Sequence, residues 1–505
     1  MQHSPVGGAA TKIIDRLERQ LTEAGLDPAL HAVSDGNAVR VIDTPRMWGK
    51  PMTKSSATAC ASTAMDDLAA TVLEIVGRAR RLVDVVSLNP PTGALLEAVK
   101  NGLLSIAERG ARSGGGPVLV RFLFGYIPVL DEVNAFTKEL SAFCASARLP
   151  MDRITIVVGQ LYSVLETSWN HAKIVAADSE TALVGGHNLW AESYGTYPPV
   201  HDLSVHVLGK AAGDAQRFAD YAWRTGGKWI TAYRINPGKA AVALPAGKER
   251  DAVCLVQLPI PTDGYERLLD AEWRHGRILT LGRGGLLKGD AGGAARVAVI
   301  RGARRRLRIC QQDLAFTGFV GEDAHEICQE IARALFATPA LKVEIVVSPI
   351  GAATHGAQYS WGFGASGTHA LLKKFIRAHA SSHGLEKSVD DALRRLAVAP
   401  FCFTDVEFTA EGKDYVWPEA PATSVIGRFV PGAKTPTLAN HQPAPGNHAK
   451  LFMADEEVCY VGSDNLYPHS LTEFGFLLEG SPVENLITDY WMHVWRYSSP
   501  HIVEG

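Results

Sequence analysis

The sequence contains no uninterrupted apolar run of about 18 residues, so it predicts no transmembrane helix. Its most apolar stretch, residues 117–130, is interrupted by Arg121 and Pro128, which is typical of a buried strand. An excess of charge of one sign is also missing, because 50 basic residues face 53 acidic ones and the net charge is −3. Without a basic field, non-specific binding of a nucleic-acid backbone is disfavoured, although a local basic cleft is not excluded.

Closely spaced cysteine pairs are absent as well. The seven cysteines are odd in number and widely scattered, and none forms a CxxC pair. This pattern predicts reduced structural thiols and gives no support for zinc or another metal. The first ten residues lack the basic and apolar regions of a signal peptide. The localisation is therefore unknown, with a secreted or delivered effector slightly favoured over a cytoplasmic protein.

The chain does contain a repeat across a long distance. In two segments, a lysine lies two residues after a histidine, an aspartate seven residues after it and an asparagine 17 residues after it. A further asparagine precedes each histidine. Chance agreement at five polar positions within a shared apolar frame is very improbable, so we interpret the segments as two copies of one unit. The matched residues are Asn170, His171, Lys173, Asp178 and Asn188 in the first copy and Asn447, His448, Lys450, Asp455 and Asn465 in the second.

The flanks of both segments alternate between strand-like and helix-like patterns. This alternation predicts an α/β fold of two tandem similar halves, each a mostly parallel or mixed sheet flanked by helices, packed about a pseudo-twofold axis. We place the halves at residues 1–240 and 241–505, with the join inside residues 228–295. Two further segments, 350–367 and 411–446, are predicted to be binding loops. The predicted strands are 81–88, 118–124, 154–158, 306–316, 341–347 and 396–403, and the predicted helices are 92–112, 131–146, 323–337 and 368–380.

The His-x-Lys spacing has a direct chemical meaning. Along a strand, residues two apart share a face, so each copy presents an imidazole beside an ammonium group. If the halves pack about a twofold axis, two cations and two imidazoles meet, which suits nucleophilic attack on a phosphodiester. Asp178 and Asp455 look like turn residues with a structural role. Asn188 and Asn465 follow glycines at strand ends, where their amides can bind phosphoryl oxygens.

The two His-x-Lys-x4-Asp segments, with their trailing glycines and asparagine, resemble the phospholipase D superfamily. Further matches resemble the secreted actinomycete-type phospholipases D. These matches are residues 168–171, 185–190, 199–202, 311–314, 462–468 and 473–475, and the resemblance covers residues 82–497. The actinomycete enzymes carry disulfides, whereas residues 46–53 here contain no cysteine, which weakens any inference of Sec-dependent export.

The resemblance implies a ping-pong mechanism without a metal or another cofactor. His171 would attack phosphorus, and His448 would protonate the leaving alcohol and then activate water or an acceptor alcohol. Lys173, Lys450, Asn188 and Asn465 would hold the phosphoryl oxygens. An acidic residue is expected behind each histidine, and the matching residues are Asp202 for His171 and Glu473 for His448, where this branch is expected to have aspartate. His187 and Asp464 would face the rim of the cleft.

A phospholipase D that acts on phosphatidylcholine-like lipids and transfers the phosphatidyl group to alcohols is the function favoured here. Both halves lie in one chain, the net charge does not suit a polyanion, and Tyr359 and Trp361 lie with Phe363 in a loop suited to a membrane interface. Trp190 is a further candidate substrate contact. We expect a monomer in peripheral contact with a membrane and no nucleic-acid partner. The alternatives are a nuclease or other phosphodiesterase, a phosphatidyltransferase that makes phospholipids, and a non-enzymatic scaffold.

Overall fold

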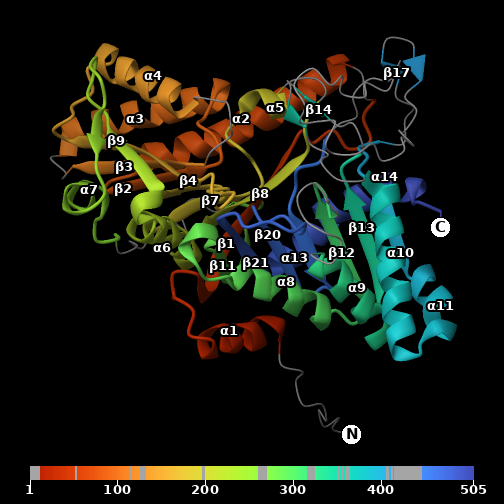
Figure 1. Ribbon diagram of the computed structural model, residues 1–505. Helices are drawn as coiled ribbons and strands as arrows, with labels where there is room; N and C mark the ends of the chain where they lie inside the picture. The colour runs from red at the N-terminus through yellow and green to blue at the C-terminus, as the bar shows by residue number, and fades with distance from the viewer. Residues whose placement is uncertain are drawn as a thin grey trace, which may run out of the picture.

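A computed structural model describes most of the chain. The described residues are 12–51, 54–113, 117–125, 132–195, 199–259, 270–314, 325–349, 364–404 and 446–504, with the two-residue strands 353–354, 357–358, 409–410 and 413–414. Figure 1 shows two groups of elements side by side, with α3 and α4 at one end and α9 and α10 at the other. Candidate residues Tyr359 and Trp361 and most of the two predicted binding loops lie outside the described residues.

The first half follows a strand–helix alternation and then three antiparallel strands. After the N-terminal helix α1 (Ile13–Glu23), its elements are β1 (His31–Thr44), α2 (Lys54–Arg78), β2 (Leu82–Ser87), α3 (Gly93–Ser113), β3 (Val118–Phe124), α4 (Glu132–Ser146), β4 (Ile154–Ser163), β5 (Ser168–Trp169), β6 (Ile174–Ala177), β7 (Thr181–Gly185), α5 (Ala191–Gly195), β8 (Asp202–Leu208) and α6 (Lys210–Thr225). The extension that follows contains η1 (Gly227–Trp229), β9 (Ile230–Arg234), β10 (Val242–Leu244) and α7 (Lys248–Cys254).

The second half repeats this order. Its elements are β11 (Arg274–Arg283), η3 (Gly285–Leu287), α8 (Ala291–Gly302), β12 (Arg306–Gln311), α9 (Glu326–Ala337), β13 (Lys342–Val347), α10 (Gly364–His383), α11 (Val389–Arg394), β16 (Leu396–Pro400), β19 (Leu451–Ala454), β20 (Val458–Gly462), β21 (Glu473–Gly480), α13 (Ser481–Asn485), the π-helical turn η6 (Leu486–Trp491) and α14 (Met492–Ser498). Most predicted strands and helices beside the two motifs are confirmed to within a few residues.

One mixed sheet runs through both halves. Its pairings place the strands in the order β10, β9, β4, β3, β2, β6, β7, β8, β1, β11, β21, β20, β19, β12, β13, β16. The first strands of the two halves, β1 and β11, pair antiparallel at the centre, with Val33 opposite Leu279. Antiparallel pairing of equivalent strands is the relation that a pseudo-twofold axis produces. The predicted α/β class with two similar halves is therefore confirmed.

The parallel strands are apolar along their whole length. All residues of β2 and β3 are buried, as is β13 after its first residue. Parallel strands are apolar along their whole length because helices cover both faces of the sheet, and neither face is exposed to solvent. Helices α2 and α3 pack on each other over the first half, and α9 and α10 do so over the second (Figure 1).

The join between the halves is more structured than we predicted. Within residues 228–295 lie β9, β10, α7, the whole of β11 and the first turns of α8. The glycine-rich residues 282–295 end one strand and begin a helix. Asp290 caps the N-terminus of this helix, because its side chain accepts from the backbone amide of Gly293. Because β9 pairs with both β4 and β10, the expected boundary at residues 240 and 241 falls inside the β9–β10 hairpin. The structural repeat begins again at β11.

Candidate active site

His171 lies just before β6 and is held by the other half of the molecule. Its backbone amide donates to the Thr472 carbonyl over 2.8 Å, and the Thr472 amide donates to the Trp169 carbonyl over 3.0 Å. These bonds form a parallel bridge between Asn170 and Thr472. The residue after Thr472 is Glu473, the first residue of β21, so the bridge places Glu473 beside His171.

His448 is held in the same way by the first half. Its amide donates to the His201 carbonyl over 2.7 Å, and the His201 amide donates to the Gly446 carbonyl over 2.7 Å. A parallel bridge therefore joins His201 to Asn447, and the next residue, Asp202, lies beside His448. Asn170 and Asn447 brace the two segments, since each side-chain amide donates over 2.8 Å to the last carbonyl of a central strand, Ser87 or Gln311.

The carboxylates are exchanged between the halves, and the pairing predicted from the resemblance is wrong. Glu473 lies 2.8 Å from His171 Nδ1, and Asp202 lies 2.7 Å from His448 Nδ1. The resemblance implies Asp202 behind His171 and Glu473 behind His448. The reason is topological, because each carboxylate follows a residue that bridges to the opposite half. In both pairs the carboxylate fixes the proton on Nδ1, which leaves the Nε2 lone pair available for reaction.

The two imidazoles face a common buried space. Their ring centroids are 6.5 Å apart, and His171 and His448 are 5% and 4% exposed. Burial lowers the pKa of both histidines well below the ordinary value, and the ammonium groups of Lys173 and Lys450 lower it further. Each unliganded imidazole is therefore neutral near pH 7, the form in which nitrogen acts as a nucleophile or base.

Lys173 and Lys450 line the same space. Each is buried, and each Nζ donates to the carbonyl of the histidine in its own motif, over 2.6 Å for Lys173. Burial lowers the pKa of Lys173 to about 7 and of Lys450 to about 8, against the opposing influence of Glu473 and Asp202. An ammonium group has three N–H donors, so two remain on each lysine for a ligand. A bound anion would favour the charged form of both lysines.

Asn188 and Asn465 have unsatisfied polar atoms. Asn188 is 4% exposed and Asn465 is fully buried. Within the described part of the chain, no partner reaches Asn188 Oδ1 or either polar atom of the Asn465 side chain. Buried amides are normally hydrogen-bonded. Their placement after the glycines of β7 and β20 fits the prediction that they bind phosphoryl oxygens.

His187 and Asp464 do not face a cleft rim as we expected. His187 is 3% exposed and contacts Thr44 Oγ1 at 3.0 Å and Ser204 Oγ at 2.8 Å. Asp464 is 1% exposed and accepts from Arg296 Nε over 2.7 Å. Asp464 keeps its charge, because the adjacent guanidinium holds the pKa of this carboxyl below its usual range in spite of burial. Both residues support the site from behind.

Asp178 and Asp455 have the structural role that we predicted. Both adopt a left-handed backbone conformation, with φ of 52° and 53°. Each carboxylate accepts from three successive backbone amides at the start of the neighbouring antiparallel strand, β2 for Asp178 and β12 for Asp455. The donors are Arg80, Arg81 and Leu82 for Asp178, and Arg304, Arg305 and Arg306 for Asp455.

Several buried supporting residues were missed by our sequence analysis. The Tyr194 hydroxyl accepts from the backbone amide of Asn188 over 2.8 Å and donates to the Asp202 carboxylate over 3.0 Å. Ser463 Oγ donates to Glu473 over 2.5 Å. Ser463 follows a glycine inside the repeated motif, which is a usable signal, whereas nothing in the spacing of Tyr194 identifies it.

One cluster among the described residues has the donor types of a metal site. Ligand atoms of Asp464, His469 and Glu473 lie within 4.8 Å of one another. Arg296 already binds Asp464, and it lies 3.2 Å from His469 Nε2. A metal ion in this cluster would face a buried guanidinium group, so the cluster does not fit a cation.

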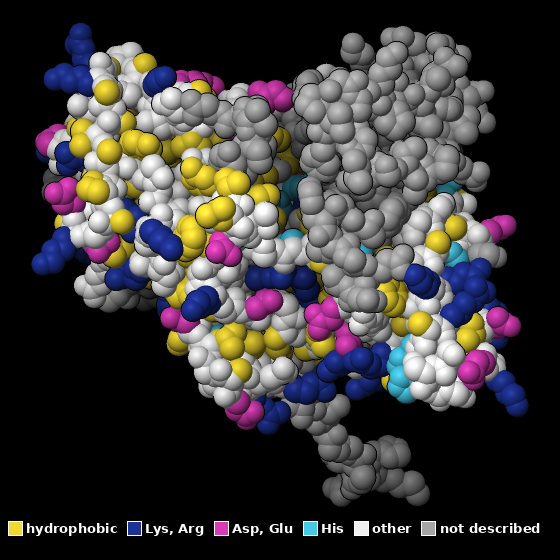
Figure 2. Space-filling model, viewed as in Figure 1, with side chains coloured by type: hydrophobic (Ala, Val, Ile, Leu, Met, Phe, Trp, Pro, Cys, Tyr) yellow, Lys and Arg dark blue, Asp and Glu magenta, His cyan; other side chains and the backbone are white. Residues whose placement is uncertain are grey.

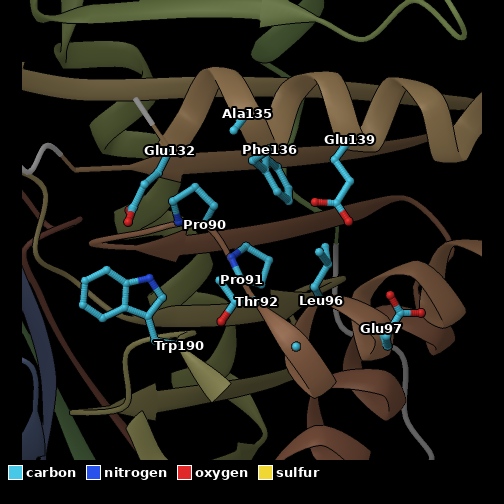
Figure 3. A pocket seen from close by; sticks show the side chains of 11 residues that line it. Pro90, Pro91, Thr92, Leu96, Glu97, Glu132, Ala135, Phe136, Glu139 and Trp190 are labelled. Carbon is cyan, nitrogen blue, oxygen red and sulfur yellow. The ribbon is translucent and has the colours of Figure 1, made fainter. Parts of the chain in front are cut away.

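A cavity of about 430 Å³ adjoins the site (Figure 3). Trp190, two residues after Asn188, lines it, and by chain length these residues lie within about 7 Å of each other. In the close-up, Glu132 of α4 lies above Trp190 and beside Pro90. Asn89 donates to the Glu132 carboxylate over 2.6 Å, and Lys100 pairs with the other two acids of the lining, Glu97 and Glu139.

Comparison with known proteins agrees with this architecture. No family model matches the chain. Among curated proteins, phospholipase D of Streptomyces antibioticus is 25% identical over 551 aligned positions, which span 97% of this chain and 88% of that protein. Among solved structures, phosphatidylserine synthase of Haemophilus influenzae Rd KW20 shares the fold with a TM-score of 0.50 at 11% identity, over 97% of this chain and 92% of the other.

The duplicated sheet and the paired His-x-Lys segments form an α/β architecture with a buried site suited to phosphodiester chemistry. Together with the similarity along nearly the whole chain, they make this protein similar to the phospholipase D superfamily, whose members are phosphodiesterases and phospholipid-modifying enzymes. Within that superfamily, the sequence is similar to a Streptomyces phospholipase D.

Proposed function

We propose that the protein is a phospholipase D that hydrolyses phosphatidylcholine-like lipids to phosphatidic acid and the head-group alcohol. The arrangement that carries this proposal is a buried pair of neutral imidazoles, each oriented by a carboxylate of the opposite half. Lys173 and Lys450 and the unsatisfied amides of Asn188 and Asn465 surround the pair. This set offers a nucleophile, a proton carrier and oxygen ligands to one phosphodiester group.

In the first step, His171 Nε2 attacks phosphorus and the bond from phosphorus to the head-group oxygen breaks. His448 Nε2 donates a proton to the departing oxygen, and a phosphatidyl–His171 intermediate remains. A phosphodiester anion between the two lysines offsets the positive charge that lowers the pKa of His448, so bound substrate favours the protonated, acidic form. The two N–H donors left on each lysine stabilise the non-bridging oxygens.

In the second step, His448 removes a proton from water, and the water oxygen attacks phosphorus. The bond between His171 Nε2 and phosphorus breaks, and phosphatidic acid leaves. A primary alcohol that takes the place of water gives a phosphatidyl-alcohol instead. Transphosphatidylation is therefore expected from the same residues.

The lining of the cavity beside Asn188 supports the proposal that the head group of the substrate is cationic. The Glu132 carboxylate and the ring of Trp190 both line it, and these are the two kinds of group that bind a quaternary ammonium ion. Within the described residues, Glu132 receives the Asn89 amide and no cationic side chain. A choline group attached to a phosphate held by Asn188 has the right charge for this cavity.

The distribution of surface charge favours a lipid substrate over a nucleic-acid substrate. In the basic run at residues 301–308, Arg301 pairs with Glu330, Arg305 with Glu456 and Arg308 with Glu344. Figure 2 shows acidic and basic side chains interspersed on the visible face. None of the described helices is long and apolar enough to cross a membrane. As part of the same proposal, the protein is a monomer that meets its phospholipid at the membrane surface.

The test is product analysis by mass spectrometry on mixed phospholipid vesicles with a primary alcohol and EDTA. Phosphatidic acid and the phosphatidyl-alcohol should both form, and neither should form with His171→Ala. A lack of lipid products with the folded wild-type protein would contradict the proposal. The same protein would then be assayed on single-stranded DNA, where cleavage would indicate a nuclease.

A further inference from the structure

Two apolar side chains are fully presented to solvent at a turn beside the active site. Among the described residues, Leu165 is the most exposed large hydrophobic residue at 93%, and its neighbour Val164 is 61% exposed. Residues 164–167, which we name the 164–167 turn, connect β4 to β5. Single exposed aliphatic residues are common, but an adjacent pair at the tip of a tight turn replaces the polar residues that turns favour.

The 164–167 turn is a firmly held structure. Its Thr167 amide donates to the Val164 carbonyl over 3.2 Å, and the Glu166 amide donates to Ser163 Oγ over 3.2 Å. The residues beside the turn contact the other half of the molecule, because Ser168 Oγ donates to the Ser470 carbonyl. The exposed pair is therefore held in a defined position relative to both halves.

The turn projects from the same sheet edge as the active site. Strand β4 runs parallel to β3, and β3 runs parallel to β2, so the carboxyl ends of all three strands share one edge. Asn170 directly follows Trp169, the last residue of β5, and its side chain donates to the Ser87 carbonyl at the end of β2. Only three residues separate Thr167 from His171. The apolar tip thus lies at the rim of the catalytic site.

Both flanks of the turn combine an apolar side chain with a lysine. On one side, β9 runs antiparallel to β4 with Ile230 opposite Leu161, so η1 lies beside the base of the turn. There Lys228 Nζ lies 4.4 Å from the ring centre of the half-buried Trp229. On the other side, η3 packs beside β5 and presents the half-buried Leu286 and the exposed Lys288.

We propose that the 164–167 turn, flanked by Lys228–Trp229 and Leu286–Lys288, inserts into the surface of a phospholipid bilayer and brings the active site to its substrate. Aliphatic tips enter the acyl region, tryptophan prefers the interface, and lysine complements phosphate and anionic head groups. The turn and the active site lie at the same edge of the sheet. Insertion of the turn therefore orients the protein with its active site toward the lipid. This proposal rests on the lipid substrate of the proposed function, but membrane binding is measurable without catalysis.

The experiment uses the inactive His171→Ala protein, so that the vesicle surface does not change during the measurement. Its binding to vesicles of phosphatidylcholine with an anionic phospholipid is measured by co-sedimentation, with and without the added pair Val164→Ser and Leu165→Ser. Loss of two inserted aliphatic side chains should weaken the partition coefficient roughly tenfold or more. The added substitution Met492→Ser is the matched control, because Met492 is 60% exposed on a different element, and it should leave binding unchanged.

A second arm places the same turn substitutions in the protein that retains His171. Turnover of vesicle lipid should fall roughly tenfold or more, whereas turnover of a short-chain phosphatidylcholine below its critical micelle concentration should stay within about twofold. Equal vesicle binding with and without the turn substitutions would overturn the proposal, as would the absence of any vesicle binding. Wild-type protein that binds vesicles through the turn but cleaves neither substrate would instead contradict the proposed function alone.

Discussion

The two halves of the molecule have the same order of strands and helices but differ around the carboxylates that contact the two histidines. In the first half, Gly186 lies against Asp202, and a Cβ at this position would lie 2.0 Å from Asp202 Oδ1. In the second half, the equivalent residue is Ser463, whose hydroxyl donates to Glu473. Burial raises the pKa of Glu473 to about 7, and nearby Asp464 adds to the effect. Duplication therefore kept the positions of the acids while their surroundings diverged.

A second difference lies in the buried charges of the central strands. In the first half, Asp84 of β2 faces Arg121 of β3. At the equivalent positions of the second half, Arg308 of β12 faces Glu344 of β13, so the two signs are exchanged. Neither strand sequence can have changed alone without leaving two like charges side by side in the interior. In each half, the two neighbouring strands therefore carry opposite charges at these positions.

The largest expected effect is the loss of kcat when either histidine is replaced, and it should differ between the two. His171→Ala removes the proposed nucleophile and should lower kcat by roughly 10⁴-fold or more, whereas His448→Ala removes the proposed proton carrier and should lower kcat by roughly 10²–10⁴-fold. Rapid-quench kinetics and mass spectrometry of the intact protein test the assignment. Phosphatidyl-protein should accumulate in the His448 variant when the leaving group is a good one. Accumulation in the His171 variant instead would reverse the two roles.

The exchanged carboxylates give the next largest effect. Glu473→Gln should disturb the Nδ1 proton of His171, and Asp202→Asn should disturb that of His448, each with a loss of roughly 10²–10⁴-fold in kcat. Proton NMR of the two imidazole N–H signals tests which histidine responds to which acid. Glu473→Asp keeps the carboxylate and should retain most activity. A change at His448 in the Glu473 variant would contradict the pairing.

The buried charge pairs should differ in their contribution to stability. Arg121 is fully buried and binds both oxygens of Asp84 as well as Asp220, so Arg121→Met leaves unpaired charges and should cost about 3–5 kcal/mol. Arg308 Nε lies 3.7 Å from Glu344, a looser contact, and Arg308→Met should cost about 1–3 kcal/mol. Urea unfolding of both variants measures the difference. A larger cost for Arg308→Met would show that the second pair is the stronger one.

The smallest expected effect concerns the two lysines. A lysine is cationic below its pKa, so a pKa of about 7 for Lys173 and about 8 for Lys450 means that affinity for a phosphate-like anion falls as pH rises through this range. Above pH 8 the affinity should fall by roughly tenfold per pH unit for each lysine. Titration calorimetry with tungstate in buffers of different ionisation enthalpy should also show proton uptake near pH 7.5. Affinity that is constant between pH 6 and 9 would contradict this expectation.

The sequence was sufficient for the repeat, the α/β class and the central residues of the site. The motif residues have the same spacing in both copies. On strands of the same fold, equal spacing gives these side chains equivalent positions in the two halves. The strands and helices next to the motifs were predicted for the same reason. The elements between residues 228 and 295 were missed, because glycines there end a strand and begin a helix, and local composition cannot distinguish that arrangement from a loop.

The sequence by itself determined that two histidines and two lysines would meet, since the duplicated halves carry them at matching positions. Only the tertiary structure decided which carboxylate orients which histidine. The parallel bridges between Asn170 and Thr472 and between His201 and Asn447 cross from one half to the other, and separations of 302 and 246 residues hide them in the chain. The burial of His187 and Asp464 was decided in the same way. Which side chains a site contains is a matter of sequence, but their partners depend on how the halves are packed.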